Sequence, residues 1–198
     1  MTIRADLQYI PQWVKAKSKV LDLGCGDGQL LSELQQQLSC KAYGLEIDHE
    51  SIIACMKKNV SVIQADLNNG LDNFDNDSFD TVIMTQSLQA MSYPDKLIQE
   101  MLRVGKEAII SFPNMGHWRS RWQLLLGKMP VTKALPHTWY DTPNIHLCTL
   151  RDFEKLCSEM DITIIERVAL NNLHRPNLLM RIMPNLFAEL VIYRFKRK

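Results

Sequence analysis

Three glycines alternate over five positions, Gly24, Gly26 and Gly28, directly after the apolar run Val20-Leu21-Asp22-Leu23. A short apolar run that ends in such a turn predicts a buried strand followed by a helix, with backbone N–H groups left free at the turn. Glycine lets a ligand approach the backbone closely and adopts positive φ without steric cost. The sequence therefore predicts that residues 18–28 bind a ligand.

The spacing of these glycines distinguishes two classes of nucleotide site. The dinucleotide fingerprint GxGxxG requires a glycine at the position of Gln29, whereas the pattern here is GxGxG. The run Gly24-Cys25-Gly26-Asp27-Gly28 resembles the glycine-rich motif of class I S-adenosylmethionine-dependent methyltransferases, and the resemblance covers residues 18–112 and the final strands. It implies an α/β, Rossmann-like fold: a mostly parallel seven-stranded sheet with an antiparallel last strand, flanked by helices.

The resemblance also implies a cofactor, S-adenosylmethionine or S-adenosylhomocysteine, and roles for individual residues. The turn amides would meet the carboxylate of the methionine moiety, with Asp22 near its ammonium group. Glu46 would accept hydrogen bonds from both ribose hydroxyls, and Asp66 would accept from the adenine amino group. The full set implied to bind the cofactor is Asp22, Gly24, Cys25, Gly26, Gly28, Glu46, Ile47, Asp66 and Leu67.

Individual members of this set have other interpretations. Glu46 is equally a solvated acid at a strand end, and Asp66 a helix or turn cap. Cys25 is either an activated thiol at a helix N-terminus or simply a small residue in a crowded turn.

The elements that must position these residues alternate along the chain, which is typical of a parallel α/β sheet. The pattern predicts a short helix within residues 3–17 that covers one sheet edge, and a helix over 49–59 that buries Ile52, Ile53 and Met56. An irregular apolar stretch is expected at 178–187. The remaining expected strands are 41–47, 60–64, 78–84, 107–112, 162–169 and 190–195, and the remaining helices are 29–38, 94–104, 118–126 and 150–160.

The chain of 198 residues is long enough for one domain, 1–198. We divide it into a cofactor-binding half (18–112), an insertion (113–148) and a C-terminal helix with strands (149–198). A formal net charge of +1 argues against nonspecific attraction to nucleic acid or anionic membranes. Scattered cysteines without ligand spacing argue against disulfides and a zinc site, and no apolar run is long enough to span a membrane, so we expect a cytoplasmic protein.

Catalysis stays open at this point. Methyltransferases that act on exocyclic amines commonly have [Asn/Asp]-Pro-Pro-[Tyr/Phe] after the fourth strand, where this chain has Thr85-Gln86-Ser87. Ala90-Met91 stands where small-molecule methyltransferases often have a histidine base. The insertion offers candidates that are either bases or structural hydrogen-bonding groups: His117, His137, Tyr140, Asp141 and His146. We assign no catalytic residue.

The insertion points to a particular family. The runs Ser111-Phe112-Pro113-Asn114-Met115-Gly116-His117-Trp118-Arg119 and Trp139-Tyr140-Asp141-Thr142-Pro143-Asn144-Ile145-His146-Leu147-Cys148, with Gln86-Ser87-Leu88-Gln89-Ala90-Met91 before them, closely resemble the MetW family of methionine biosynthesis proteins. The resemblance covers nearly the whole chain. It implies a methyltransferase-like protein that binds homoserine O-acyltransferase and is needed for its full activity.

Two segments are candidates for the partner surface. Arginine and tryptophan are enriched at interface hot spots, and the insertion holds Trp118, Trp122 and Trp139 among basic residues. The competing interpretation is a lid or edge helix that buries these aromatics in its own core. The second segment, residues 178–187, is apolar and rich in methionine, which adapts to a partner or simply covers the last strands. Tryptophans among leucines and prolines do not favour nucleic-acid binding.

The expected function is an S-adenosylmethionine-binding accessory subunit that activates homoserine O-acyltransferase, whose cofactor site reports the product of the pathway. The chain has no GxSxG elbow, so the partner would carry out the acyl transfer. The alternative is an active small-molecule methyltransferase. The sequence does not distinguish an acetyl from a succinyl donor, and it does not give the stoichiometry or the direction of any cofactor effect.

Overall fold

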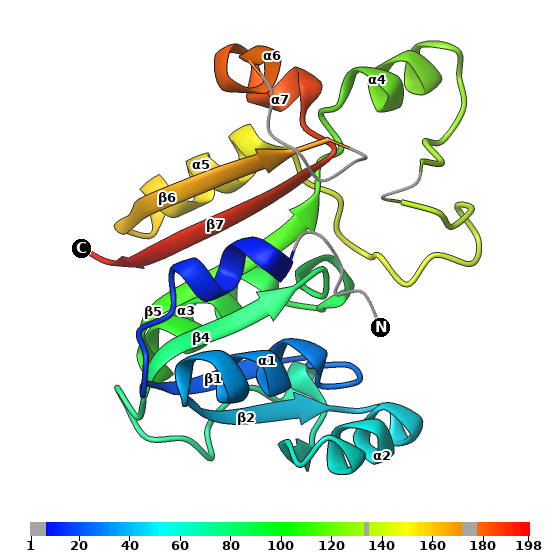
Figure 1. The fold of residues 1–198 in the computed structure, drawn as a ribbon. Helices are drawn as coiled ribbons and strands as arrows, with labels where there is room; N and C mark the ends of the chain where they lie inside the picture. Colours follow the sequence, from blue (N-terminus) through cyan, green and yellow to red (C-terminus); the bar gives the residue numbers. More distant parts are fainter. Residues whose placement is uncertain (1–6, 133–134, 172–177) are drawn as a thin grey trace.

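A seven-stranded sheet forms the centre of the computed structural model, which describes residues 7–132, 135–171 and 178–198. The strands lie in the order β3-β2-β1-β4-β5-β7-β6 (Figure 1). β7 is antiparallel to β5 and β6, and the other pairs are parallel, which confirms the predicted sheet. The strands are β1 (Lys19–Leu23), β2 (Lys41–Glu46), β3 (Ser61–Gln64), β4 (Phe79–Thr85), β5 (Gly105–Pro113), β6 (Ile162–Leu170) and β7 (Leu190–Arg197).

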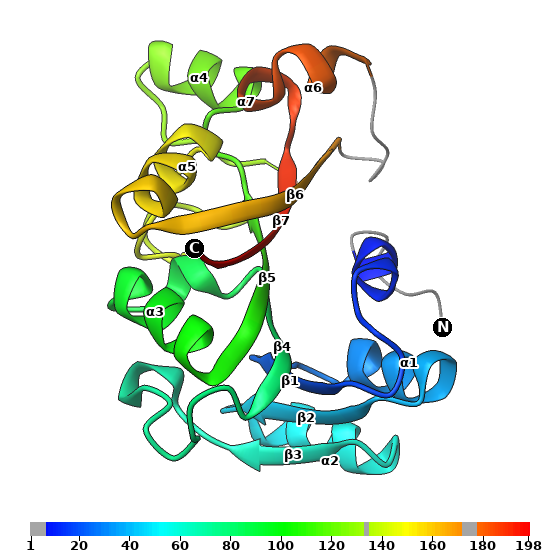
Figure 2. The same cartoon turned by 90° about the vertical axis from the view of Figure 1, so that its left-hand side faces the viewer.

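Helices cover both faces of this sheet, and each face has its own apolar cluster. One cluster joins the sheet to the short 3-10 helix η1, to α1 and to Cys55 of α2. The other joins it to α3 and α5. Figure 2 shows α1 and η1 on one side of the sheet and α3 and α5 on the other. The helices are η1 (Leu7–Gln12), α1 (Gln29–Leu38), α2 (His49–Lys57), η2 (Leu67–Asn69), η3 (Leu88–Ala90), α3 (Pro94–Val104), α4 (Trp118–Leu125), α5 (Leu150–Glu159), α6 (Leu178–Ile182) and α7 (Pro184–Phe187).

α2 corrects one prediction about burial. Cys55 is its only buried residue, whereas Ile53 is exposed and Met56 is 65% exposed. The helix lies beside β3 at the edge of the sheet, where most strand residues are themselves exposed. Hydrophobic spacing shows which side chains share a face of a helix, but it does not show how much of that face the sheet covers.

Two further segments differ from their predicted form. Within the predicted 3–17 helix, the described part forms the six-residue helix η1, and its buried residues pack on a face of the sheet instead of an edge; residues 3–6 lie outside the described residues. The stretch 178–187 is not irregular but forms α6 and α7, with Pro184 at the start of α7. Proline favours the first position of a helix because its missing N–H has no intrahelical partner there.

Candidate functional site

The glycine turn connects β1 to α1, and each of its three glycines adopts positive φ. A Cβ at Gly24 would lie 2.9 Å from Ser87 Oγ, and a Cβ at Gly28 would lie 2.7 Å from Cys55 Sγ. A Cβ at Gly26 would meet nothing within 4 Å. Neighbouring side chains therefore leave no room for a Cβ at Gly24 or Gly28, whereas Gly26 faces space that a ligand can approach.

The N–H groups of the turn are not free, contrary to the prediction. Those of Gly24 and Cys25 donate to Leu45 O, and that of Gly28 donates to Cys25 O. The N–H of Gly26 donates to Glu46 Oε2 over 2.7 Å. Backbone N–H groups that are shielded from water need partners, and a turn between two buried elements takes them from the adjacent strand.

Glu46 ends β2 and is buried against the turn. Its Oε1 accepts hydrogen bonds from the N–H groups of Ile47 and Asp48, at 2.8 and 3.0 Å. With Gly26 on Oε2, three of about four acceptor positions of the carboxylate are occupied. Glu46 is therefore not a solvated acid at a strand end. To accept from two ribose hydroxyls, it would have to exchange at least one backbone contact.

α2 and the residue that follows it hold the turn from the other side. Lys58 Nζ forms an ion pair with Asp27 Oδ2 at 2.6 Å and also donates to Asp27 O. Cys55 Sγ donates to Gly26 O over 3.1 Å. The conformation of the turn is thus fixed before any ligand binds.

Cys25 packs in this turn as a small side chain. Its sulfur lies 3.8 Å from Cys55 Sγ, and a Cβ on Gly44 would clash with it. Burial, and then the negative charge of Asp22, raises the pKa of the Cys25 thiol far above its usual value. The activated-thiol interpretation is therefore wrong, because a thiolate is disfavoured at this position.

A cavity of about 400 Å³ opens beside the turn, at the carboxyl ends of β1 and β4. The strand order reverses between these two strands, which is where open α/β sheets bind ligands. The lining contains no lysine or arginine and two carboxylates, Asp22 and Asp27, of which Asp27 already pairs with Lys58 from outside the lining. Such a lining favours a ligand that carries positive charge. The lining residues are Leu7, Asp22, Gly24, Cys25, Gly26, Asp27, Gln29, Leu30, Thr85, Gln86 and Ser87.

Sequence reasoning did not assign Thr85, Gln86 and Ser87 to this site. Gln86 has φ of +57°, and its N–H donates to Ser111 O at the end of β5. A non-glycine residue in this conformation is uncommon, and such residues gather at functional sites. The signal available in the sequence was their position after β4, because the carboxyl ends of parallel strands share one sheet edge.

The other predicted cofactor residues lie outside the lining of this cavity. Ile47 is exposed beside the turn, and Asp66 is exposed and caps η2 by accepting from the N–H of Asn68. Leu67 is buried in the core and lines a different cavity next to α3. The structure thus brings together Asp22, Gly24, Cys25 and Gly26, with Gly28 and Glu46 supporting them from behind.

None of the candidate bases from the insertion lines the cavity. His117 is buried and caps α4, accepting from the N–H of Arg119. Burial, and then the charge of Arg119, lowers the pKa of His117 to about 4. His146 Nε2 lies 3.3 Å from Ser92 O, and Asp141 accepts from Thr138 Oγ1. Within the described residues, His117, Asp141 and His146 thus have structural contacts away from the cavity.

A second region leaves large apolar side chains uncovered. In the insertion, Trp122 is 58%, Leu125 76% and Trp139 73% exposed. The interpretation of α4 as a helix that buries its aromatics in its own core is therefore wrong. We call this region the aromatic surface and define it as the exposed residues Trp118, Trp122, Leu124, Leu125, Leu126, Met129, Trp139 and Tyr140. Large apolar side chains left in water in such number within one segment are typical of interaction sites. Lys133 of the insertion lies outside the described residues.

Comparison with known proteins identifies the family. The family model described as methionine biosynthesis protein MetW matches residues 4–195. The bifunctional methionine biosynthesis protein MetXA/MetW of Rhodopirellula baltica is 35% identical over 178 residues, which are 85% of this chain and 29% of that protein. The chain thus spans less than a third of the length of this relative.

Solved structures share the fold at low sequence identity. A methyltransferase from Mesorhizobium loti that depends on S-adenosylmethionine has a TM-score of 0.72 at 13% identity, over 98% of this chain and 99% of that one. A TehB-like methyltransferase from Corynebacterium glutamicum gives 0.65 at 14% identity, over 100% and 89%. The [4+2]-cyclase SpnF has a TM-score of 0.67 at 14% identity, over 98% of this chain and 80% of that one. A protein named as a cyclase thus shares this fold with the methyltransferases.

In the part of the chain that the structure describes, no helix has the length and apolar character needed to cross a membrane. The fold is that of class I methyltransferases, and fold alone does not establish an activity. The family model, by contrast, matches nearly the whole chain. The chain belongs to the MetW family of methionine biosynthesis proteins.

Proposed function

We propose that this chain is an accessory subunit that binds S-adenosylmethionine and activates a homoserine O-acyltransferase in methionine biosynthesis. The observation that carries the proposal is the relative named MetXA/MetW, which joins two methionine biosynthesis proteins in one chain. Fusion raises the effective concentration of one partner near the other to about millimolar, which favours proteins that act as a complex. The family resemblance implies that the partner is homoserine O-acyltransferase.

Two features support S-adenosylmethionine or S-adenosylhomocysteine as the ligand of the cavity. The carboxylate of Asp22 suits an ammonium group, and in S-adenosylmethionine also a sulfonium, whereas Asp27 is already paired with Lys58. The open space at Gly26 permits close approach of a ligand. In this proposal Gly24, Cys25, Gly26 and Gly28 form the wall at the methionine end, and Glu46 with Ile47 receives the ribose. Asp66 and Leu67 stay a prediction for the adenine end.

The composition of the cavity favours an accessory role over methyl transfer. Transfer to an amine or hydroxyl is helped by a positioned proton acceptor. Among its lining residues the only ionisable groups are Asp22, Asp27 and Cys25. Asp27 is paired with Lys58, the proposed binding mode uses Asp22 for the ammonium group, and the pKa of Cys25 is raised by burial. The alternative, an active small-molecule methyltransferase, predicts that labelled methyl groups pass from S-adenosylmethionine to a metabolite pool.

The two exposed apolar regions support a protein partner. The aromatic surface and the segment 178–187 leave large side chains in water, with Leu178 and Ile182 among the most exposed. We assign the contact with the acyltransferase to Trp118, Trp122, Trp139 and this segment. Aromatic side chains that become buried at an interface commonly contribute most of the binding free energy.

The decisive experiment combines the purified chain with the purified acyltransferase. Acyl transfer to homoserine is measured with and without the chain, and again with S-adenosylmethionine present. We expect co-elution and a higher turnover in the mixture. Unchanged turnover together with separate elution would contradict the proposal, and methyl transfer to a metabolite without any effect on the acyltransferase would support the alternative.

A further inference from the structure

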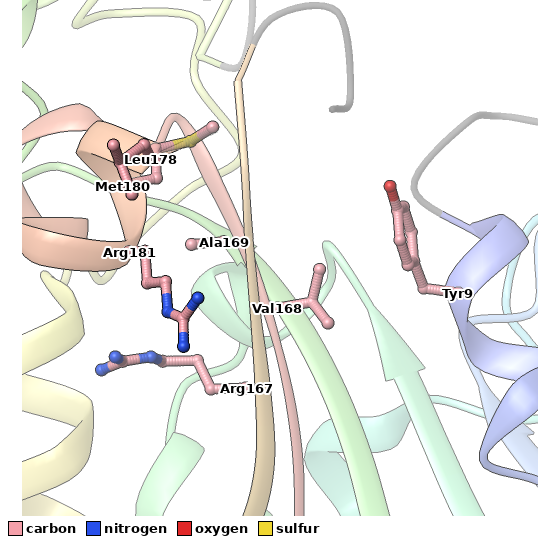
Figure 3. A pocket seen from close by; sticks show the side chains of 7 residues that line it. All are labelled: Tyr9, Arg167, Val168, Ala169, Leu178, Met180 and Arg181. Carbon is pink, nitrogen blue, oxygen red and sulfur yellow. The ribbon is translucent and has the colours of Figure 1, made fainter. Parts of the chain in front are cut away.

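A groove rich in arginine runs between α5, α7 and the edge strand β6. It encloses about 280 Å³ and is lined by Arg121, Leu150, Arg151, Glu154, Arg167, Ile182, Met183, Pro184, Asn185 and Leu186. A wider cavity of about 550 Å³ adjoins it, shares Arg167 and adds Arg181. Figure 3 shows Arg167 and Arg181 on one side of β6 and Tyr9 on the other. We call the ten lining residues together with Arg181 the arginine groove.

The charges of the arginine groove do not balance. Its only carboxylate, Glu154, already accepts from Arg167 over 2.6 Å and from the Tyr193 hydroxyl over 2.8 Å. Arg151 and Arg181 form no hydrogen bond or ion pair with any residue that the structure describes (7–132, 135–171 and 178–198). Two guanidinium groups, each with five N–H donors, are thus available to an acidic group.

The position of Arg151 is unfavourable for the helix that carries it. Arg151 is the second residue of α5, whose N-terminus has a capping box formed by Thr149 and Asp152. The helix dipole favours negative charge in the first turn and disfavours a cation there. A residue whose charge is unfavourable for its helix, and which has no compensating contact in the described part of the chain, points to a role other than folding. Arg151 is such a residue.

The walls between the arginines are apolar and exposed. Ile182 is 69% exposed and Met183 51%, and Leu178 and Leu179 continue the apolar area along α6. A phosphate or another small anion would pair with the guanidinium groups but would leave these side chains in water. A polypeptide segment with both apolar and acidic side chains would satisfy both. Methionine adapts well to such a contact because its side chain is flexible and polarisable.

We propose that the arginine groove binds an acidic, apolar segment of the acyltransferase partner, with Asp or Glu carboxylates paired to Arg151 and Arg181. This inference rests on the proposed function and specifies the chemistry of the contact. The planar guanidinium fork binds a carboxylate through two parallel hydrogen bonds, so each arginine also fixes the orientation of the segment.

Charge reversal tests the groove. For the double variant Arg151→Glu, Arg181→Glu, we expect the affinity for the acyltransferase to fall about 30-fold, because like charges then face each other. The salt dependence of binding should become weaker, while calorimetry should find unchanged S-adenosylmethionine binding. Arg151→Glu alone should leave the melting temperature unchanged or raise it, since Glu suits the first turn of a helix. The melting temperature of the double variant is measured too, and a value equal to that of wild type shows that loss of binding does not reflect unfolding.

Lys41→Glu is the matched control for Arg151→Glu, because Lys41 is exposed at the start of β2 and each of these single substitutions changes the net charge by the same amount. If wild-type protein binds and both Arg variants bind as Lys41→Glu does, the groove is not the contact, and the proposed function stands. If the wild-type chain itself neither binds nor activates the acyltransferase, both proposals fail. Inorganic phosphate that binds wild type but not Arg181→Glu, with the complex unaffected, would overturn the inference in favour of a small-anion site.

Discussion

The glycine turn and the aromatic surface differ in how many of their groups have partners within the chain. In the turn, the backbone N–H groups of Gly24, Gly26 and Gly28 have partners within the protein, and Lys58 pairs with Asp27. At the aromatic surface, Trp122 and Trp139 are mostly exposed. The first region is preorganised around a small space, whereas the second lacks cover for its apolar area. This difference is what we expect if, as proposed, the turn binds a small ligand and the surface binds a protein partner.

The two regions share one edge of the sheet. β4 leads to the cavity and β5 leads into the insertion, and the two strands are parallel. The N–H of Gln86, in the cavity lining, donates to Ser111 O near the end of β5. β5 leads directly into the segment that holds the aromatic surface. If ligand binding moves the backbone of Gln86, this hydrogen bond would transmit the movement to β5.

The largest effect is expected at the aromatic surface. Trp122→Ser combined with Trp139→Ser should weaken acyltransferase binding about 100-fold, because buried tryptophans dominate interface energies. The free energy of unfolding should change by no more than about 0.5 kcal/mol, since both rings are exposed in the isolated chain. Affinity is measured by surface plasmon resonance and stability by urea titration.

Met56→Ser is the control for that pair, because Met56 is equally exposed but lies on α2 beside β3. If the tryptophan variant bound the acyltransferase with unchanged affinity, the aromatic surface would not be the partner contact, and the contrast with the glycine turn would fail. A large loss of stability would show that the rings pack within the chain.

Substitutions of the turn glycines are expected to have the next largest effect. They separate Gly28, which the fold needs, from Gly26, which the ligand approaches. Gly28→Val should destabilise the fold by about 3 kcal/mol, since it combines positive φ with a clash against Cys55. Gly26→Ala should cost about 1–2 kcal/mol for φ alone, yet it should abolish S-adenosylmethionine binding. Thermal melts and calorimetry separate these outcomes.

Gly127→Ala is matched to Gly26→Ala, because both glycines have positive φ and open space around Cβ. It should cost the same stability and leave cofactor binding intact. Equal cofactor affinity in the two alanine variants would mean that Gly26 does not face the ligand.

Glu46→Gln is expected to have a smaller effect on stability. The amide has one acceptor oxygen where the carboxylate has two, so one of the contacts to Gly26, Ile47 and Asp48 is lost, at a cost of about 1–2 kcal/mol. Binding of S-adenosylmethionine should weaken as well if the ribose uses this carboxylate. Wild-type cofactor affinity would limit Glu46 to supporting the turn.

The smallest effect concerns the pH dependence of α4. The pKa of His117 is lowered to about 4 by burial and by Arg119, against 6.5 for the free side chain. Between these values the unfolded chain binds the proton more strongly, so His117 contributes stability above about pH 6.5 that is lost as pH falls towards 4. Urea titrations across this range should show less pH dependence in His117→Asn, which keeps a capping residue. Identical profiles would contradict the assignment.

Much of the fold follows from the sequence, because strands and helices alternate and α3 spans Pro94–Val104 as its spacing predicts. Exposure did not follow, as Met56 and the tryptophans show, because periodicity carries no information about what covers a face. In the site, Asp22 and Gly26 follow from the motif. Gln86 and Lys58 did not, since their roles depend on which strand and helix ends meet in space.

The position of β7 has a consequence for how the chain matures. β7 follows the other six strands of this sheet in sequence, yet it pairs with both β5 and β6 and contributes the buried side chains of Tyr193 and Phe195. Until it leaves the ribosome, β6 has no partner in the sheet and β5 has an open edge. Contacts between residues that are distant in sequence form late, so the sheet closes only once β7 has been synthesised. A substitution that weakens the pairing of β7 therefore acts on the step that completes the sheet.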